Sequence, residues 1–130
     1  MNVAKKIPAW VTPLTETVGP AVNSLLAAHG LAMATLISAY GDTEKAMPKE
    51  VASFMWWFCV GFIFSLLSSF AFYAMKMALA GQHLPDAKPV EERGLNIIVG
   101  IFLIGSVLSF IILIFEMIDV AGYFWKAAQQ

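Results

Sequence analysis

The chain has 130 residues, of which 59% are hydrophobic and 13% are charged, and its net charge is −1. Soluble domains carry about 25% charged residues, so this composition indicates a membrane protein. A chain this close to neutral offers no basic surface for nucleic acid. Cys59 is the only cysteine and therefore cannot form a disulfide within the chain.

Residues 1–20 form a polar segment that is interrupted by Pro8, Pro13 and Pro20, and we expect no span there. Residues 21–40 are apolar, although polar side chains occur among them. At 100° per residue, alanine, serine and threonine gather on one face of a helix over this range, which lets another helix approach closely. We therefore predict a first spanning helix near residues 21–40. A helix that lies among the headgroups is the alternative.

Two long apolar runs dominate the rest of the sequence. Residues 51–75 are 25 positions without a charge, and residues 95–115 are 21. About 20 apolar residues in a helix cross the ~30 Å hydrocarbon core of a bilayer. We predict spans near residues 51–76 and 95–118, and hence an all-α fold, a small transmembrane bundle of three spans. A two-span hairpin with an interfacial helix is the alternative, and the long runs exclude an outer-membrane barrel.

The positive charges predict how the spans are oriented, because cytoplasmic loops are enriched in lysine and arginine. For three spans, five such residues lie on the N-terminal side and three on the other, which favours the N-terminus inside and the C-terminus outside. For two spans, the same rule places both termini inside. The five are Lys5, Lys6, Lys76, Lys88 and Arg93, and the three are Lys45, Lys49 and Lys126.

Small residues recur at helical spacing in the second and third spans. Gly61, Ser65 and Ser69 are four positions apart, with Ser68 beside them, and Gly105 and Ser109 repeat this spacing. Such patterns let two helix backbones approach closely. They predict a helix-packing interface, which either joins this chain to a partner or packs the three helices of one bundle together.

Two acidic residues follow the last apolar run. Glu116 and Asp119 are three positions apart and share one face of a helix. Inside the hydrocarbon they would be costly and would indicate a proton or ion site. Counting about 20 residues from Leu95 places them at the boundary instead, and we expect both in the headgroup region, without a transport role.

His29 is the only ionisable residue well inside a predicted span. A neutral histidine there can hydrogen-bond a neighbouring helix or carry a proton, and we expect a structural hydrogen bond. No cysteine, histidine or carboxylate lies three or four positions from it, so the sequence predicts no metal site.

Three stretches carry a resemblance to known proteins: the alanine-rich residues 24–32, the run from Phe58 through Tyr73, and residues 106–110. Together they cover about residues 21–110. They resemble a loose group of small, uncharacterised bacterial inner-membrane proteins. The resemblance implies a three-helix fold and a multi-pass location in the bacterial inner membrane, and it implies no activity.

The sequence contains no phosphate-binding loop, zinc-protease motif or nucleophile elbow, so we expect neither an enzyme nor a cofactor. The preferred function is a non-enzymatic accessory or structural subunit. It would act in the lipid bilayer by helix–helix association, as a homo-oligomer or in a larger membrane complex. One alternative is a holin-like or effector-type oligomer that permeabilises membranes. Another is a small proton or ion transporter that uses His29, Glu116 or Asp119.

Overall fold

The computed structural model describes residues 9, 11–41, 47–81 and 91–130. These residues form three helices, α1 (Val11–Tyr40), α2 (Lys49–Gly81) and α3 (Glu92–Ala127), and no strand. All three helices are long and apolar enough to cross a membrane. The predicted all-α architecture with three spans is confirmed, and a multi-pass membrane protein follows from it.

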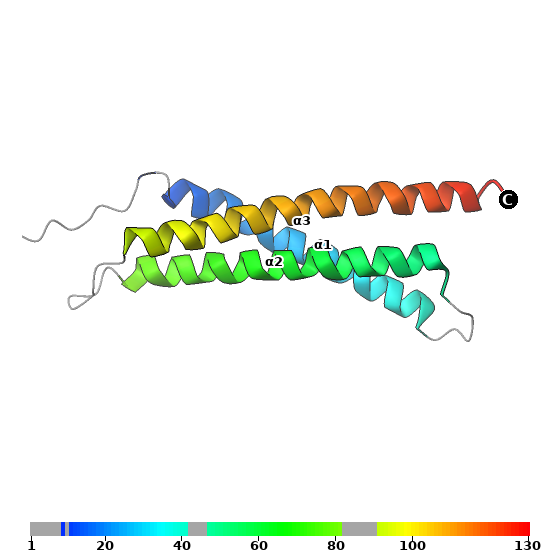
Figure 1. Cartoon of the computed structure of the whole chain (residues 1–130), viewed down its shortest axis with the longest axis horizontal. Helices are drawn as coiled ribbons and strands as arrows, with labels where there is room; N and C mark the ends of the chain where they lie inside the picture. The colour runs from blue at the N-terminus through cyan, green and yellow to red at the C-terminus, as the bar shows by residue number, and fades with distance from the viewer. Residues whose placement is uncertain (1–8, 10, 42–46, 82–90) are drawn as a thin grey trace, which may run out of the picture.

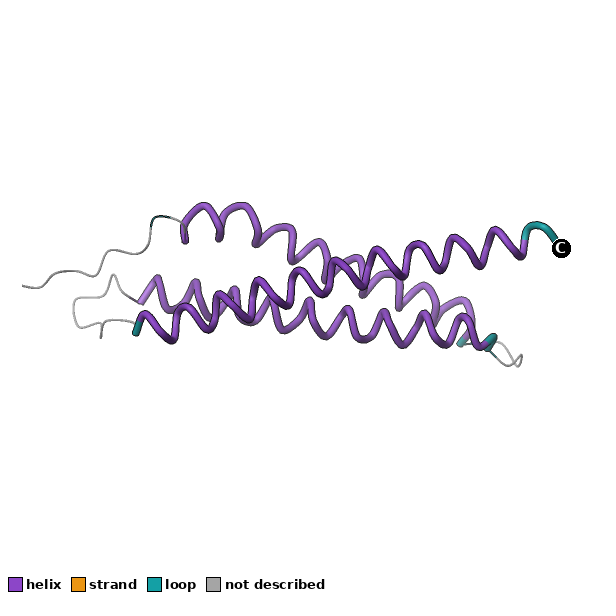
Figure 2. The backbone as a smooth tube through the Cα atoms, turned by 45° about the horizontal axis from the view of Figure 1, so that its top comes forward, coloured by secondary structure: helices purple, strands orange, loops and turns teal. Residues whose placement is uncertain are grey.

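The helices form an elongated bundle in which α2 and α3 run antiparallel, side by side (Figure 1). Their contact is the most extensive of the three helix pairs. α1 crosses both at an angle, and its contact with α3 is the smallest (Figures 1 and 2). The first residues of α1 and the last residues of α3 lie at opposite ends of the bundle (Figure 1). Which end faces the cytoplasm stays a prediction from the charges.

α1 begins ten positions earlier than the predicted span. Residues 1–8 and Trp10 of the predicted polar segment lie outside the described residues, whereas residues 11–20 form the first turns of this helix. Pro13 lies in the first turn, where backbone N–H groups have no partner within the helix. Pro20 lies inside the helix without ending it, and Ser24 Oγ donates to the Pro20 carbonyl oxygen at 3.0 Å.

Tertiary packing explains the early start of α1. Val11 is fully buried against Met75 of α2 and Leu95 of α3. Leu14 and Val18, three and seven positions later, also pack against the apolar core, so they continue the same face. The apolar contacts of this face outweigh the one backbone hydrogen bond that Pro20 removes.

The interior of the bundle has an apolar half and a polar half. The apolar half lies toward the first residues of α1, and Phe102 of α3 marks its inner limit, stacked on Phe72 with ring centroids 5.5 Å apart. Its buried members are Val11, Val22, Ala71, Met75, Leu95, Val99 and Phe102. The buried polar side chains lie beyond, toward the last residues of α3, and they form the candidate site.

Candidate functional site

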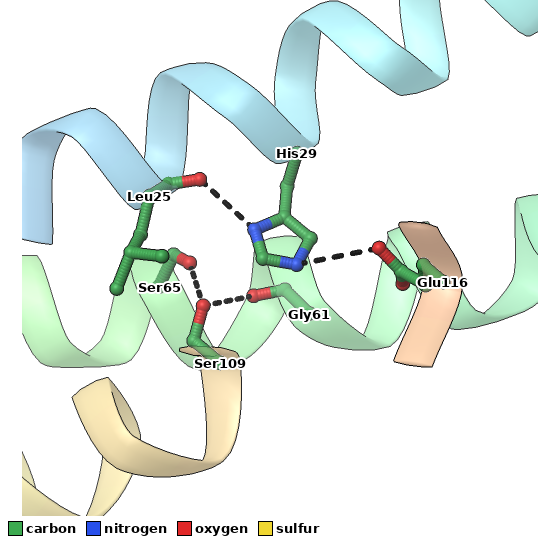
Figure 3. A network of polar contacts seen from close by, with 6 residues as sticks. All are labelled: Leu25, His29, Gly61, Ser65, Ser109 and Glu116. Atoms are coloured by element: carbon green, nitrogen blue, oxygen red, sulfur yellow. Dashed lines mark hydrogen bonds and ion pairs between the residues drawn. The ribbon is translucent and has the colours of Figure 1, made fainter. Parts of the chain in front are cut away.

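Serine hydroxyls join α2 and α3 in the polar half. Ser68 Oγ donates to the Phe102 carbonyl oxygen at 2.9 Å, and the hydroxyls of Ser68 and Ser106 lie 2.6 Å apart. Further along, Ser65 and Ser109 share a hydrogen bond, and Ser109 Oγ lies 3.3 Å from the Gly61 carbonyl oxygen (Figure 3). Interhelical hydrogen bonds of this kind contribute about 0.6 kcal/mol each in membrane proteins.

The other predicted packing residues also lie between helices of the same chain. A Cβ atom built on Gly105 would lie 3.2 Å from the Phe64 carbonyl oxygen and 3.3 Å from Ser68 Cβ. Glycine at this position therefore permits close approach of α3 to α2. Ser69 is half-buried on α2, with its Oγ 3.4 Å from Asn23 Oδ1 on α1. In this structure the small-residue stripes serve packing within one bundle.

α1 contributes His29 to this interior. Its ring is fully buried, and its Nδ1 lies 2.9 Å from the Leu25 carbonyl oxygen one turn earlier. A carbonyl oxygen only accepts hydrogen bonds, so Nδ1 carries a proton and donates it. The ring rests on Gly61 of α2, where a Cβ atom would overlap the imidazole (Figure 3). Gly61 thus leaves the space that the His29 ring occupies.

Glu116 of α3 faces the other nitrogen of His29. Glu116 Oε2 lies 3.6 Å from His29 Nε2, and the carboxylate side chain is 2% exposed (Figure 3). Neither carboxylate oxygen of Glu116, nor His29 Nε2, has a hydrogen-bond partner among the described residues. Leaving such buried polar atoms unpaired costs about 1–3 kcal/mol for each atom.

Glu116 is buried within the bundle, and its depth relative to the headgroups stays a prediction. His29 lies near the middle of the apolar stretch 16–40 of α1. Because α1 is tilted, His29 faces Glu116, the α3 residue that directly follows the last apolar run. Glu116 therefore faces protein although it lies near the end of that run. Asp119, one turn further along α3, is exposed. Its position relative to the headgroups stays a prediction.

The hydrogen bond from His29 Nδ1 determines which atoms of the His29–Glu116 pair can exchange a proton. Because Nδ1 keeps its proton on the Leu25 carbonyl, only Nε2 and the Glu116 carboxylate remain as exchange positions. With one proton between them, the pair is either neutral imidazole beside a carboxylic acid or imidazolium beside a carboxylate. Both forms are neutral overall, which suits a buried location.

A pocket of about 240 Å³ connects Glu116 with Asp119 along the groove between α2 and α3. Its apolar walls come from both helices. The lining residues are Phe54, Trp57, Ile112, Phe115, Glu116 and Asp119. Asp119 and Trp57 are exposed, so the pocket reaches from the outside of the bundle to the Glu116 side chain, whose carboxylate oxygens are buried behind it.

The buried polar side chains are distributed over a length of about two-thirds of the ~30 Å hydrocarbon core of a bilayer. Glu116 and Phe102 are separated by about 21 Å of α3, given a rise of 1.5 Å per residue. Buried serines of α2 and α3 lie between these two levels. The apolar half begins at Phe102, so apolar side chains close the polar interior at that end, while the pocket beside Asp119 lies at the other.

The described residues contain no group of three or more histidine, cysteine or acidic side chains that could hold a metal ion. Cys59 lies instead 3.4 Å from the thioether sulfur of Met33 and joins α2 to α1 as a soft packing contact. Comparison of the chain with protein-family models, curated proteins and solved structures finds no match.

Proposed function

We propose that this chain is a small, non-enzymatic, multi-pass membrane protein that takes up and releases a proton at the His29–Glu116 pair. It would act as a small proton transporter, or as the proton-carrying subunit of a complex in the bacterial inner membrane. The observation that carries the proposal is the buried pair itself, 3.6 Å apart, with unsatisfied atoms beside a pocket.

A purely structural role for this pair is the weaker explanation. Ionisable side chains in membrane interiors are costly, and a well-packed apolar pair would stabilise the bundle as well or better. The serines already provide satisfied interhelical hydrogen bonds next to the pair. A group that must gain and lose a proton, in contrast, requires polar atoms that are not held permanently by other partners.

The test is proton flux into proteoliposomes under an imposed pH gradient, read with an internal pH-sensitive dye. The wild-type protein should acidify vesicles faster than protein-free controls, and Glu116→Gln should lose this flux because an amide cannot carry the proton. Glu50→Gln is the matched control, since Glu50 is exposed in the first turn of α2. Wild-type flux equal to that of empty vesicles, or unchanged in Glu116→Gln, would contradict the proposal.

Lateral association is the second candidate, and α1 favours it. Ser24, Ala27, Ala34, Thr35 and Ser38 are exposed on this helix, which buries the smallest share of its apolar window among the three. Such side chains let a further helix approach closely, as an accessory subunit or homo-oligomer requires. Native mass measurement in mild detergent tests it. A permeabilising oligomer would instead release large dyes from vesicles, whether or not Glu116 is present.

A further inference from the structure

We propose that the pocket between Phe54 and Asp119 binds an organic ammonium group, and that this cation and the proton compete for Glu116. The occupant is a protonated or quaternary amine that carries apolar substituents. The inference rests on the proposed function, because it names the substrate class of the same carboxylate. It draws on three features of the pocket: its walls, its acids and its size.

The walls of the pocket suit a cation with an apolar surface. Phe54 and Trp57 come from α2, and Ile112 and Phe115 come from α3. Aromatic faces attract ammonium groups through the negative charge above the ring, most strongly for tryptophan. Aliphatic and aromatic side chains also pack against the methyl or methylene groups of an amine. Three aromatic side chains around one pocket therefore suit an organic cation.

Two acidic residues, Glu116 and Asp119, supply the negative charge of the pocket. Glu116 is one of its lining residues, and its buried carboxylate, directed at His29 Nε2, has no hydrogen-bond partner among the described residues. Asp119 adds a second carboxyl group nearer the outside, and the six lining residues include no basic side chain. An ammonium group that enters would thus meet an attractive charge, and once the Glu116 side chain turns toward the pocket it would satisfy a polar group that the bundle leaves unsatisfied.

A hard metal ion fits this pocket poorly. Calcium and magnesium take six or more oxygen ligands in a polar cage. Among the six lining residues, only Glu116 and Asp119 offer side-chain oxygens, and the other four are apolar or aromatic. The volume of about 240 Å³ also exceeds what a bare ion needs and falls slightly below that of typical drug pockets. The space suits a small amine or the head group of a larger one.

The same carboxylate cannot serve the proton and the cation together. The cation requires ionised Glu116, and its positive charge disfavours a second positive charge on His29 Nε2, so its binding releases the proton that the His29–Glu116 pair shares. The charged or titratable groups that face Glu116 are His29 from α1 and Asp119 from α3, whereas Phe54, Trp57 and Gly61 from α2 carry no charge. A fall in pH protonates the pair and should weaken cation binding.

The test is calorimetric binding of choline to the full-length protein in nanodiscs of phosphatidylglycerol, a lipid without an amine. The neutral analogue 3,3-dimethylbutan-1-ol has nearly the same shape and serves as the matched probe. We expect saturable binding of choline alone, weakened at least about tenfold by Glu116→Gln. Trp57→Leu should weaken it about 3- to 10-fold through loss of the aromatic face, while Trp56→Leu, on the exposed neighbour, should not.

Two further arms complete the experiment. Binding should weaken as pH falls, and nanodiscs that contain phosphatidylethanolamine should block choline if a lipid head group is the natural source of the ammonium. Equal binding of choline and the neutral analogue, or full binding by Glu116→Gln, would overturn the inference. If choline does not bind but proton flux is intact, the cation site is refuted and the proposed function is not. Choline binding without proton flux refutes the proposed function and leaves the site standing.

Discussion

Gly61 and His29 determine each other's place in the bundle. The imidazole lies where a side chain at position 61 would project, so Gly61→Ala forces the ring to move away. Overpacking in a well-packed interior costs about 1–3 kcal/mol, and we expect that loss in the free energy of unfolding in detergent. The displaced ring should also lose its contact with Glu116, so we expect proton flux to decrease together with the free energy of unfolding.

Gly100→Ala is the control for this prediction. A Cβ atom at Gly100 on α3 meets no described atom within 4 Å, and alanine favours a helix by about 1 kcal/mol over glycine. We expect this variant to be as stable as the wild type or slightly more stable. If both alanine variants unfold alike, the close contact between Gly61 and His29 does not exist in the protein.

The residues of the site could be recognised in the sequence, but the contact between His29 and Glu116 could not. His29 is recognisable as an ionisable group inside a span, and Glu116 as an acid that follows one. Glu116 lies two turns after Ser109, on the packing face of α3, and that spacing was the available signal for its burial. The contact itself depends on the tilt of α1, which follows from side-chain packing across helices and not from any local pattern.

At the scale of helices, Ser65 tests whether the serines hold α2 against α3. Ser65→Ile places a larger side chain at a fully buried position opposite Ser109, and we expect a loss of about 1–3 kcal/mol in unfolding free energy. Ser65→Ala removes the hydrogen bond alone and should cost only about 0.6 kcal/mol. Ser53→Ile, on an exposed position of α2, is the control and should change little. Equal stability of Ser65→Ile and Ser53→Ile would mean that Ser65 faces lipid.

The positions of the spans were predictable where apolar runs are long, whereas the limits of the helices were not. Spans expected at residues 51–76 and 95–118 lie within α2 and α3. The helices extend beyond both runs, because backbone hydrogen bonds continue past the hydrocarbon core as long as side chains permit. α1 begins earlier than the prolines indicate because the apolar spacing of Val11, Leu14 and Val18 packs its first turns against the core.

At the scale of the whole molecule, the bundle is asymmetric along its length. Apolar side chains fill the end where α1 begins, while serines, His29 and Glu116 lie toward the end of α3, beside the buried Val51 and Phe58. Large apolar side chains, Phe70, Ile104 and Phe115 among them, are exposed on the outside, as a lipid-facing surface requires. Protons would therefore enter from the Asp119 end, and passage to the other side requires the apolar half to rearrange.

The central claim is that His29 and Glu116 share one exchangeable proton inside the membrane. The most direct test is solid-state nitrogen NMR of ¹⁵N-labelled histidine in lipid bilayers, with His83→Gln so that His29 alone reports. We predict that Nδ1 stays protonated across the pH range, that the Nε2 signal follows pH, and that Glu116→Gln shifts the Nε2 signal while Glu50→Gln does not. An Nε2 chemical shift that is the same in the wild type and in Glu116→Gln would contradict a proton shared between His29 and Glu116.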